Sequence, residues 1–117
     1  MFATPGARAT SVEYDAMARV IVRGRLMCAD DAQVALVSRL LPSHIDRTRA
    51  EPGCVSFVVE QTANPRVWRV DEVFVDAESF EAHRNRVRSS NWGRLTAAIR
   101  RDYTLLDGGD HLGEPGE

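Results

Sequence analysis

The hydrophobic period of this chain changes from two residues to 3.6 residues and back, and this order is what most constrains its fold. Residues 18–28 alternate apolar and polar side chains, which is typical of a strand with one apolar face. Residues 31–49 carry apolar side chains at three- and four-residue spacing, behind a carboxylate cap at Asp30 or Asp31, and this pattern predicts an amphipathic helix. The Pro52-Gly53 pair ends that helix.

The second half of the chain repeats the pattern with two strands before its helix. Asn64 and Pro65 form a turn signal between two apolar segments, which favours a hairpin. Asp76 then offers a helix cap, and Gly93 weakens the middle of the helix that follows, so we expect a bend at residues 89–91. The elements predicted after the first helix are strands at residues 54–61 and 67–75, a helix at 77–101 and a closing strand at 103–106.

This order of elements predicts an α+β domain over residues 17–107 with the ferredoxin-like arrangement β-α-β-β-α-β. Two right-handed crossovers would place both helices on one face of a four-stranded antiparallel sheet. Residues 1–16 are predicted to be a flexible N-terminal arm, and residues 108–117 a disordered C-terminal tail, because both lack a periodic apolar pattern.

The third predicted strand suggests how the protein assembles, because neither of its faces is convincingly polar. A sheet with helices on one face only should not keep its other face apolar unless a partner covers it. We therefore expect a homodimer formed through the open sheet face. The two faces of this strand carry Trp68, Val70, Glu72 and Phe74 on one side and Arg69, Asp71, Val73 and Val75 on the other.

Composition excludes several classes of function. The 117 residues carry a net charge of only −2, whereas a nucleic-acid-binding protein usually shows a basic excess.

The N-terminus lacks the apolar core of a signal peptide and no apolar run approaches membrane-spanning length, so we expect a cytoplasmic protein with no membrane partner. The two cysteines, Cys28 and Cys54, are too few for a metal cluster or a disulfide framework, and we expect reduced thiols packed near strands.

Three segments resemble a known family, the antibiotic biosynthesis monooxygenases, which are small dimeric α+β-barrel proteins that include quinol monooxygenases. Residues 48–54 read TRAEPGC at the entry to the second predicted strand, and residues 70–76 read VDEVFVD on the third. Residues 77–83, AESFEAH, open the second predicted helix. With the matching order of elements, the resemblance covers about residues 18–106.

The resemblance implies a dimer whose sheets form a barrel, with a pocket between sheet and helices. Several relatives oxygenate quinols or aromatic polyketides with molecular oxygen and no bound cofactor, whereas others degrade haem, isomerise small signalling molecules or have no established activity. Three positions depart from the family pattern: Phe74 stands where cofactor-free oxygenases have Trp, Val70 where some have a polar residue, and Asp71 where many have Tyr. Fold and family therefore do not fix the reaction.

Glu72 and His83 are the predicted catalytic pair. Alternation along the third strand places Glu72 on the side that, by the resemblance, faces the helices, and His83 lies one helical turn after Phe80. A carboxylate beside an imidazole fixes its tautomer and raises its basicity, which makes a general base for a phenol or enol proton. The alternative is that the two residues form an inert buried pair, or that His83 lies at the solvent edge.

The predicted binding residues are mostly aromatic. Aromatic side chains at such spacing are more often core than ligand platform, with Trp92 the expected exception because it follows the bend. The arginines of the second helix predict a solvated face, or alternatively Arg86 or Arg88 guiding an anionic ligand. His44 and His111 are assigned to the surface and the tail. The predicted substrate-binding residues are Phe57, Trp68, Val70, Phe74, Phe80, Arg86, Asn91 and Trp92.

The sequence therefore predicts a cofactor-independent monooxygenase acting on a quinol or an aromatic polyketide-like phenol, with no metal and no cofactor. Two alternatives stay open. One is a non-catalytic dimer that binds a small molecule, favoured by Val70, Asp71 and Phe74; the other is a haem-degrading relative, for which His83 would be the axial ligand. Nucleotide-loop, zinc-site and nucleophile-elbow motifs are lacking from the sequence.

Overall fold

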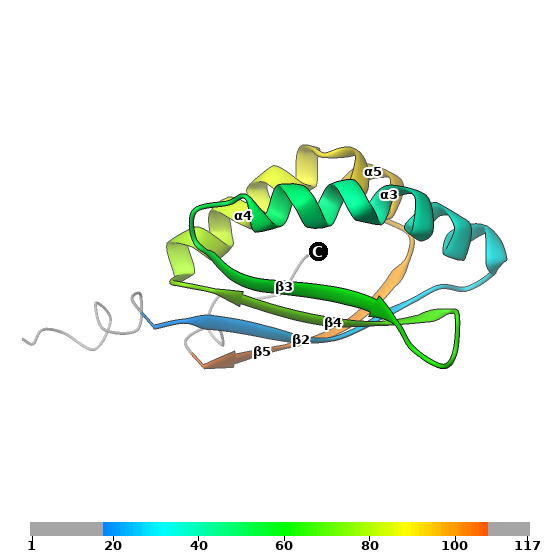
Figure 1. Cartoon of the computed structure of the whole chain (residues 1–117), viewed down its shortest axis with the longest axis horizontal. Coiled ribbons are helices and arrows are strands. Elements are labelled where there is room, and N and C mark those ends of the chain that lie inside the picture. Colours follow the sequence, from blue (N-terminus) through cyan, green and yellow to red (C-terminus); the bar gives the residue numbers. More distant parts are fainter. Residues whose placement is uncertain (1–17, 108–117) are drawn as a thin grey trace, which may run out of the picture.

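A computed structural model describes residues 18–107 (Figure 1). The predicted arm at residues 1–16 and the predicted tail at residues 108–117, with His111, lie outside the described residues. Within residues 18–107, no helix is long and apolar enough to cross a membrane. The elements are β2 (Val20–Met27), α3 (Asp31–Arg49), β3 (Cys54–Gln61), β4 (Val67–Phe74), α4 (Ala77–Ser89), α5 (Asn91–Leu95) and β5 (Arg100–Asp107).

The four strands form one sheet in the order β3-β4-β2-β5, in which all neighbouring strands are antiparallel. Figure 1 shows α3, α4 and α5 together over one face of this sheet. The order and the single helical layer confirm the predicted ferredoxin-like β-α-β-β-α-β fold. The other face is covered by none of the described elements (Figure 1).

Both long helices begin at an aspartate, as predicted. Asp30 accepts a hydrogen bond from the backbone N–H of Gln33 at 2.9 Å, and the Gln33 side chain accepts one from the N–H of Ala29, the residue before the cap, at 2.7 Å. Asp76 accepts from the N–H of Ser79 at 2.7 Å. Each cap satisfies a backbone donor that the first turn of a helix leaves without a partner.

The predicted second helix is wrong at its C-terminal end. It divides at Ser90, as expected, into α4 and α5, but α5 ends at Leu95 and β5 already begins at Arg100. Thr96 closes α5, because its hydroxyl and its N–H both donate to the carbonyl of Trp92, at 2.5 and 3.0 Å. Arg101 then donates to the carbonyls of Thr96 and Ile99, at 2.8 and 3.0 Å, and holds the turn into the strand.

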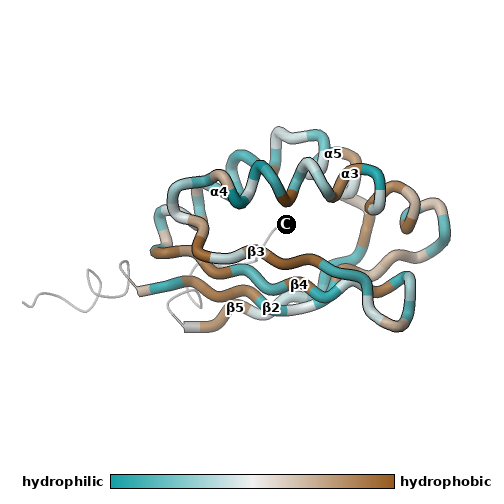
Figure 2. Tube along the Cα trace, in the orientation of Figure 1, coloured by the Kyte–Doolittle hydropathy of each residue, from teal (hydrophilic) through white to brown (hydrophobic). Residues whose placement is uncertain are grey.

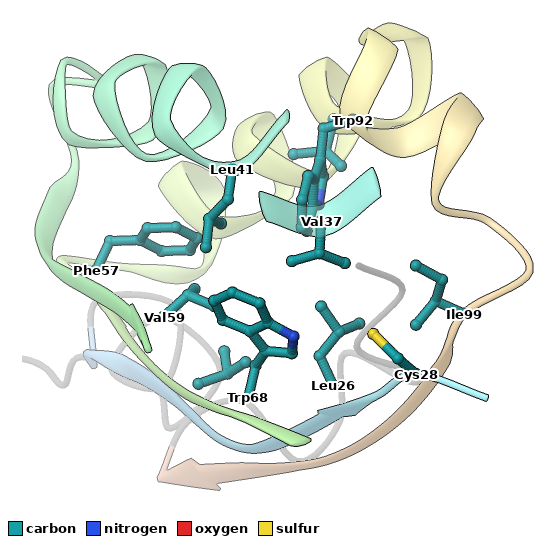
Figure 3. Close-up of a cluster of buried hydrophobic side chains, with 11 residues drawn as sticks. Leu26, Cys28, Val37, Leu41, Phe57, Val59, Trp68, Trp92 and Ile99 are labelled. Atoms are coloured by element: carbon teal, nitrogen blue, oxygen red, sulfur yellow. The ribbon is translucent and has the colours of Figure 1, made fainter. Parts of the chain in front are cut away.

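The core fills the space between the helices and the inner face of the sheet. Hydrophilic colour covers much of the helices in Figure 2, whereas hydrophobic stretches run along the strands. In Figure 3, Trp68 and Leu26 rise from the sheet toward Val37 and Leu41 of α3. A second cluster lies at the other end of the sheet, where Val20, Val22, Phe74 and Phe80 are fully buried.

Both cysteines are free thiols, as expected. Cys28 lies in the core beside Trp68, and its burial raises the pKa of the thiol above its usual value. Cys54 is only partly buried at the start of β3. A raised pKa lowers the thiolate fraction, so Cys28 is a packing residue rather than a nucleophile.

The outer face of the sheet is more charged than the sequence pattern predicts. Arg69 of β4 contacts Glu60 at 2.8 Å and also pairs with Asp71, and Arg23 of β2 lies 3.5 Å from Asp71. The outer face has an apolar part at the end of the sheet where Ile21 pairs with Val73 on one side and Leu106 on the other. The outer face therefore combines an apolar end with a network of ion pairs.

Gly24 allows β2 and β5 to approach each other closely. A Cβ atom on Gly24 would lie 2.2 Å from the carbonyl oxygen of Asp102 and 2.7 Å from the Cα of Tyr103, and both are backbone atoms of the paired strand. We therefore expect Gly24→Ala to lower the free energy of unfolding by about 1–3 kcal/mol, the usual cost of overpacking. Urea denaturation at constant m-value measures this change. Arg25→Ala, at the exposed neighbouring position, is the control; equal stability of the two variants would contradict the packing argument.

Candidate functional site

His83 and Glu72 face each other from α4 and β4. The buried side of α4 carries Phe80, His83 and Val87 at three- and four-residue spacing, which points the imidazole toward the sheet. Glu72 lies on the inner face of β4, between Val70 and Phe74, as the alternation predicts. Both side chains are buried, at 0% exposure for His83 and 1% for Glu72.

Two carboxylates flank the His83 imidazole. Glu51 Oε1 lies 2.9 Å from Nδ1, within hydrogen-bond distance, and Glu72 Oε1 lies 4.0 Å from Nε2. Glu51 comes from the turn that ends α3. A carboxylate accepts from Nδ1–H, so this contact selects the tautomer in which Nε2 is the basic nitrogen, facing Glu72. The nearer orienting carboxylate is thus Glu51, whereas the sequence prediction gave this role to Glu72.

Arg86 connects the pair to α3. Its Nε donates to Glu51 Oε2 at 2.5 Å and its Nη2 donates to Thr48 Oγ1 at 3.1 Å. The guanidinium is held three residues after His83 on α4, so one helical turn presents both a cation and an imidazole to the same carboxylate. A positive charge beside Glu51 offsets the cost of placing a carboxylate that is only 18% exposed next to a buried imidazole.

Aromatic rings surround the imidazole. The ring centroid of Phe74 lies 4.8 Å from that of His83, and those of Phe57 and His44 lie 6.0 and 6.2 Å away. Phe80 packs on Phe74 at 5.5 Å. Such surroundings exclude water, which strengthens every electrostatic interaction of the imidazole with its two carboxylates.

His44 is not a surface residue, so its predicted assignment is wrong. It is 3% exposed, and its ring stacks on Trp92 with centroids 4.6 Å apart and planes 6° from parallel. The buried face of α3 consists of Val37, Leu41, His44 and Thr48. This spacing of four, three and four residues is visible in the sequence, but the polarity of histidine obscured it.

The predicted binding residues divide into two groups. Phe57, Trp68, Val70, Phe74 and Phe80 belong to the hydrophobic core, the more common role for such residues. Arg86 and Asn91 line a cavity of about 130 Å³ between α3 and the α4–α5 junction, here called the interhelix cavity, and Trp92 belongs both to the core and to the lining of this cavity.

A groove borders His83 on the side of Glu51. It has a volume of about 380 Å³, above the lower end of the range for ligand sites. Gly53 forms part of the wall of this groove. A Cβ atom on Gly53 would lie 2.2 Å from the Cβ of Ser79, so the backbone approaches α4 closely here. The groove is lined by Glu51, Pro52, Gly53, Glu78, Ser79, Ala82, His83 and Arg86.

Sequence reasoning missed Glu51, the closest partner of His83. Glu51 lies 32 residues before His83, and its segment was interpreted only as a helix stop and as part of the family resemblance. Hydrophobic periodicity places residues on faces of helices and strands, and it carries no information about which way a turn residue points. Arg86 was expected to face solvent or to guide an anionic ligand, whereas in the structure it forms an ion pair with the Glu51 side chain.

The arrangement fits proton transfer better than metal or haem ligation. An iron ion at Nε2 would have to displace Glu72, which lies 4.0 Å from this nitrogen, whereas the contact of Glu51 with Nδ1 is compatible with a histidine that binds a metal. Among residues 18–107, no group of three or more His, Cys, Asp or Glu side chains could hold a metal ion. A buried imidazole with one oriented nitrogen and one basic nitrogen can accept a proton from a weak acid.

Comparison with known protein families gives one match. The family model described as antibiotic biosynthesis monooxygenase matches residues 19–94, which include Glu51, Glu72 and His83. A comparison with curated proteins found no match.

Solved structures show the same fold at low sequence identity. Rv0793 from Mycobacterium tuberculosis is 23% identical over 76% of this chain and 93% of its own, with a TM-score of 0.61. A protein from Nitrosomonas europaea assigned to the antibiotic biosynthesis monooxygenases is 16% identical over 80% of this chain and 92% of its own, with a TM-score of 0.67. A third, from Caulobacter crescentus and with the same assignment, is 15% identical over 84% of this chain and 97% of its own, with a TM-score of 0.60.

Removing the Glu51 carboxylate should destabilise the protein. We expect Glu51→Ala to lower the free energy of unfolding by about 2–3 kcal/mol, because it leaves the buried imidazole and the Arg86 guanidinium without their shared acceptor. Glu78→Ala is the matched control, since Glu78 lines the same groove but is exposed on α4. Urea unfolding measures both variants. Equal losses would show that the Glu51 contacts contribute nothing beyond those of an exposed carboxylate.

Proposed function

The chain belongs to the antibiotic biosynthesis monooxygenase family, and on this basis we propose that it is a cofactor-independent monooxygenase acting on a quinol or an aromatic polyketide-like phenol. The single observation that carries the proposal is the buried imidazole of His83, with Glu51 at Nδ1 and Glu72 opposite Nε2. Family membership narrows the chemistry, and this arrangement supplies the general base that the chemistry needs.

In the proposed reaction, His83 Nε2 takes the phenolic proton. The contact of Nδ1 with Glu51 stabilises the imidazolium that forms, and Glu72 adds a second negative charge on the side of the new N–H. The resulting phenolate is electron-rich enough to pass an electron to dioxygen directly. One oxygen atom then remains on the substrate and the other leaves as water, with the substrate supplying the electrons.

The aromatic surroundings support the same proposal. Phe57 and Phe74 exclude water from the imidazole, which protects a reactive phenolate and its oxygenated products. Because His83 is fully buried, a phenol must displace neighbouring side chains to reach Nε2. We place its entry at the groove beside Glu51 and Arg86, whose wall contains the exposed residue Ala82.

Replacing the base should abolish turnover and leave the fold intact. We expect His83→Gln to lower kcat by about 100-fold or more, the lower range for loss of general base catalysis, because glutamine has similar polarity but no basic nitrogen. Oxygen consumption with a panel of hydroquinones and phenols measures the rate, and far-ultraviolet circular dichroism checks the fold. Arg88→Gln, exposed on the same helix, is the control. If His83→Gln consumes oxygen as fast as the parent protein, His83 is not the base.

A second candidate function is non-catalytic binding of a small aromatic molecule. It is favoured by the packing of Phe74 and Val70 into the core, where relatives with oxygenase activity are expected to carry Trp and a polar residue. Saturable binding of the same panel without oxygen uptake would select this function over the first.

We also propose that the protein acts as a homodimer through the outer face of the sheet. The apolar end of this face contains Ile21, Val73 and Leu106, and no described element covers it. The charged part adjoins it, with Arg69 between Glu60 and Asp71, and provides both signs of charge for a partner sheet.

A charge placed at the apolar end should therefore separate the protomers. We expect Val73→Asp to be monomeric at a concentration at which the parent chain is dimeric, because the new carboxylate would be desolvated in the interface. Ser38→Asp, exposed on α3, adds the same charge to the helical side and should leave the dimer intact. Sedimentation equilibrium measures both. A dimeric Val73→Asp variant would place the interface elsewhere.

A further inference from the structure

The interhelix cavity has a chemical character that the proposed reaction does not use. Its walls come from α3 on one side and from α4 and α5 on the other. The polar groups that enter it include the side chains of Arg47 and Ser43 from α3 and of Arg86 from α4. His44 and Trp92, stacked on each other, form an aromatic surface at its base.

The charge of this cavity is positive. Its lining includes two guanidinium groups, those of Arg47 and Arg86, and no carboxylate. Glu51 already accepts from the Nε of Arg86 and so offsets much of the charge of that guanidinium. Arg47 therefore supplies most of the net positive charge at the cavity.

One donor of Arg86 is buried without a protein partner. Arg86 uses its Nε for Glu51 and its Nη2 for Thr48, but its Nη1 is buried and has no hydrogen-bond partner among residues 18–107. Buried donors are nearly always satisfied, and a bound water or ion is one of the explanations for a specific exception in a native fold. Because a guanidinium carries its charge over all three nitrogens, an anion is the partner that Nη1 prefers.

Two further polar groups of the residues that line the cavity are engaged elsewhere. The hydroxyl of Ser90 donates to the carbonyl of Val87 at 2.7 Å and accepts from the N–H of Gly93 at 3.1 Å. The Asn91 side-chain oxygen accepts from Arg94 at 2.6 Å. The side chains that could bind a ligand here therefore include the two arginines, the hydroxyl of Ser43 and the amide N–H groups of Asn91.

We propose that the interhelix cavity binds a small oxyanion, a carboxylate or a phosphate group, between Arg47 and the Nη1 of Arg86. Its volume of about 130 Å³ corresponds to about four water molecules, which is enough for a carboxylate or a phosphate group. The oxyanion is either a free ion or a substituent of the substrate. A substituent is geometrically reasonable, because Arg86 lines both this cavity and the groove beside His83, and the rings of His44 and His83 are 6.2 Å apart.

The experiment measures binding of three probes by calorimetry under anaerobic conditions and at low ionic strength. The probes are inorganic phosphate, hydroquinone and 2,5-dihydroxybenzoate, which is hydroquinone with one carboxylate. The proteins are the parent chain, Arg47→Gln and the matched control Arg39→Gln, which removes an exposed arginine from the same helix. Because oxygen is excluded, the result does not depend on turnover, and only the assignment to a substrate substituent rests on the proposed function.

We expect Arg47→Gln to weaken the binding of anionic probes only. The dissociation constant of the anionic probe should rise about tenfold in Arg47→Gln, the effect of losing one charge-assisted hydrogen bond, and should not change in Arg39→Gln. If 2,5-dihydroxybenzoate binds more tightly than hydroquinone and shows this loss, the oxyanion belongs to the substrate. If phosphate alone shows it, the site holds a free ion. The proposal is overturned if neither anion binds, or if both variants weaken binding equally, since that is general surface electrostatics.

Discussion

Burial of an ionisable imidazole between two carboxylates is the constraint on which the rest of this structure depends. A charge in the interior is costly unless it is paired and hydrogen-bonded, and here three side chains from three parts of the chain share the task. Glu51 comes from the turn after α3, Glu72 from β4, and His83 from α4. Arg86 adds the positive charge that balances Glu51. The contacts of the candidate site therefore also join α4 to the sheet and to the turn after α3.

The fold was predictable because its determinants are local or periodic. Alternation along β4 places Glu72 inside, and helical spacing on α4 places Phe80, His83 and Val87 on one face. Asp30 and Asp76 begin the helices as their positions predict. The end of α5 was missed because the hydrogen bonds of Arg101 to the preceding turn, which stabilise an early stop, are not visible as a pattern.

The site was predictable only in part. Periodicity identified Glu72 and His83, because both lie on regular elements, but it could not identify Glu51, whose side-chain direction is set by the turn after α3. The sequence also placed His44 wrongly on the surface, because histidine is a polar residue. Its burial depends on stacking against Trp92, and this contact cannot be recognised from the sequence. The sequence could not show which of the aromatic residues pack in the core and which also line a cavity, because this distinction depends on tertiary packing.

The most direct measurement of the central claim is the ¹⁵N chemical shifts of the His83 imidazole, before and after anaerobic addition of a phenolic ligand. We expect the free protein to have a protonated Nδ1 at Glu51 and a basic Nε2 facing Glu72, and the bound complex to have protons on both nitrogens. A free protein with the proton on Nε2, or a ligand that binds and leaves both shifts unchanged, would contradict the account.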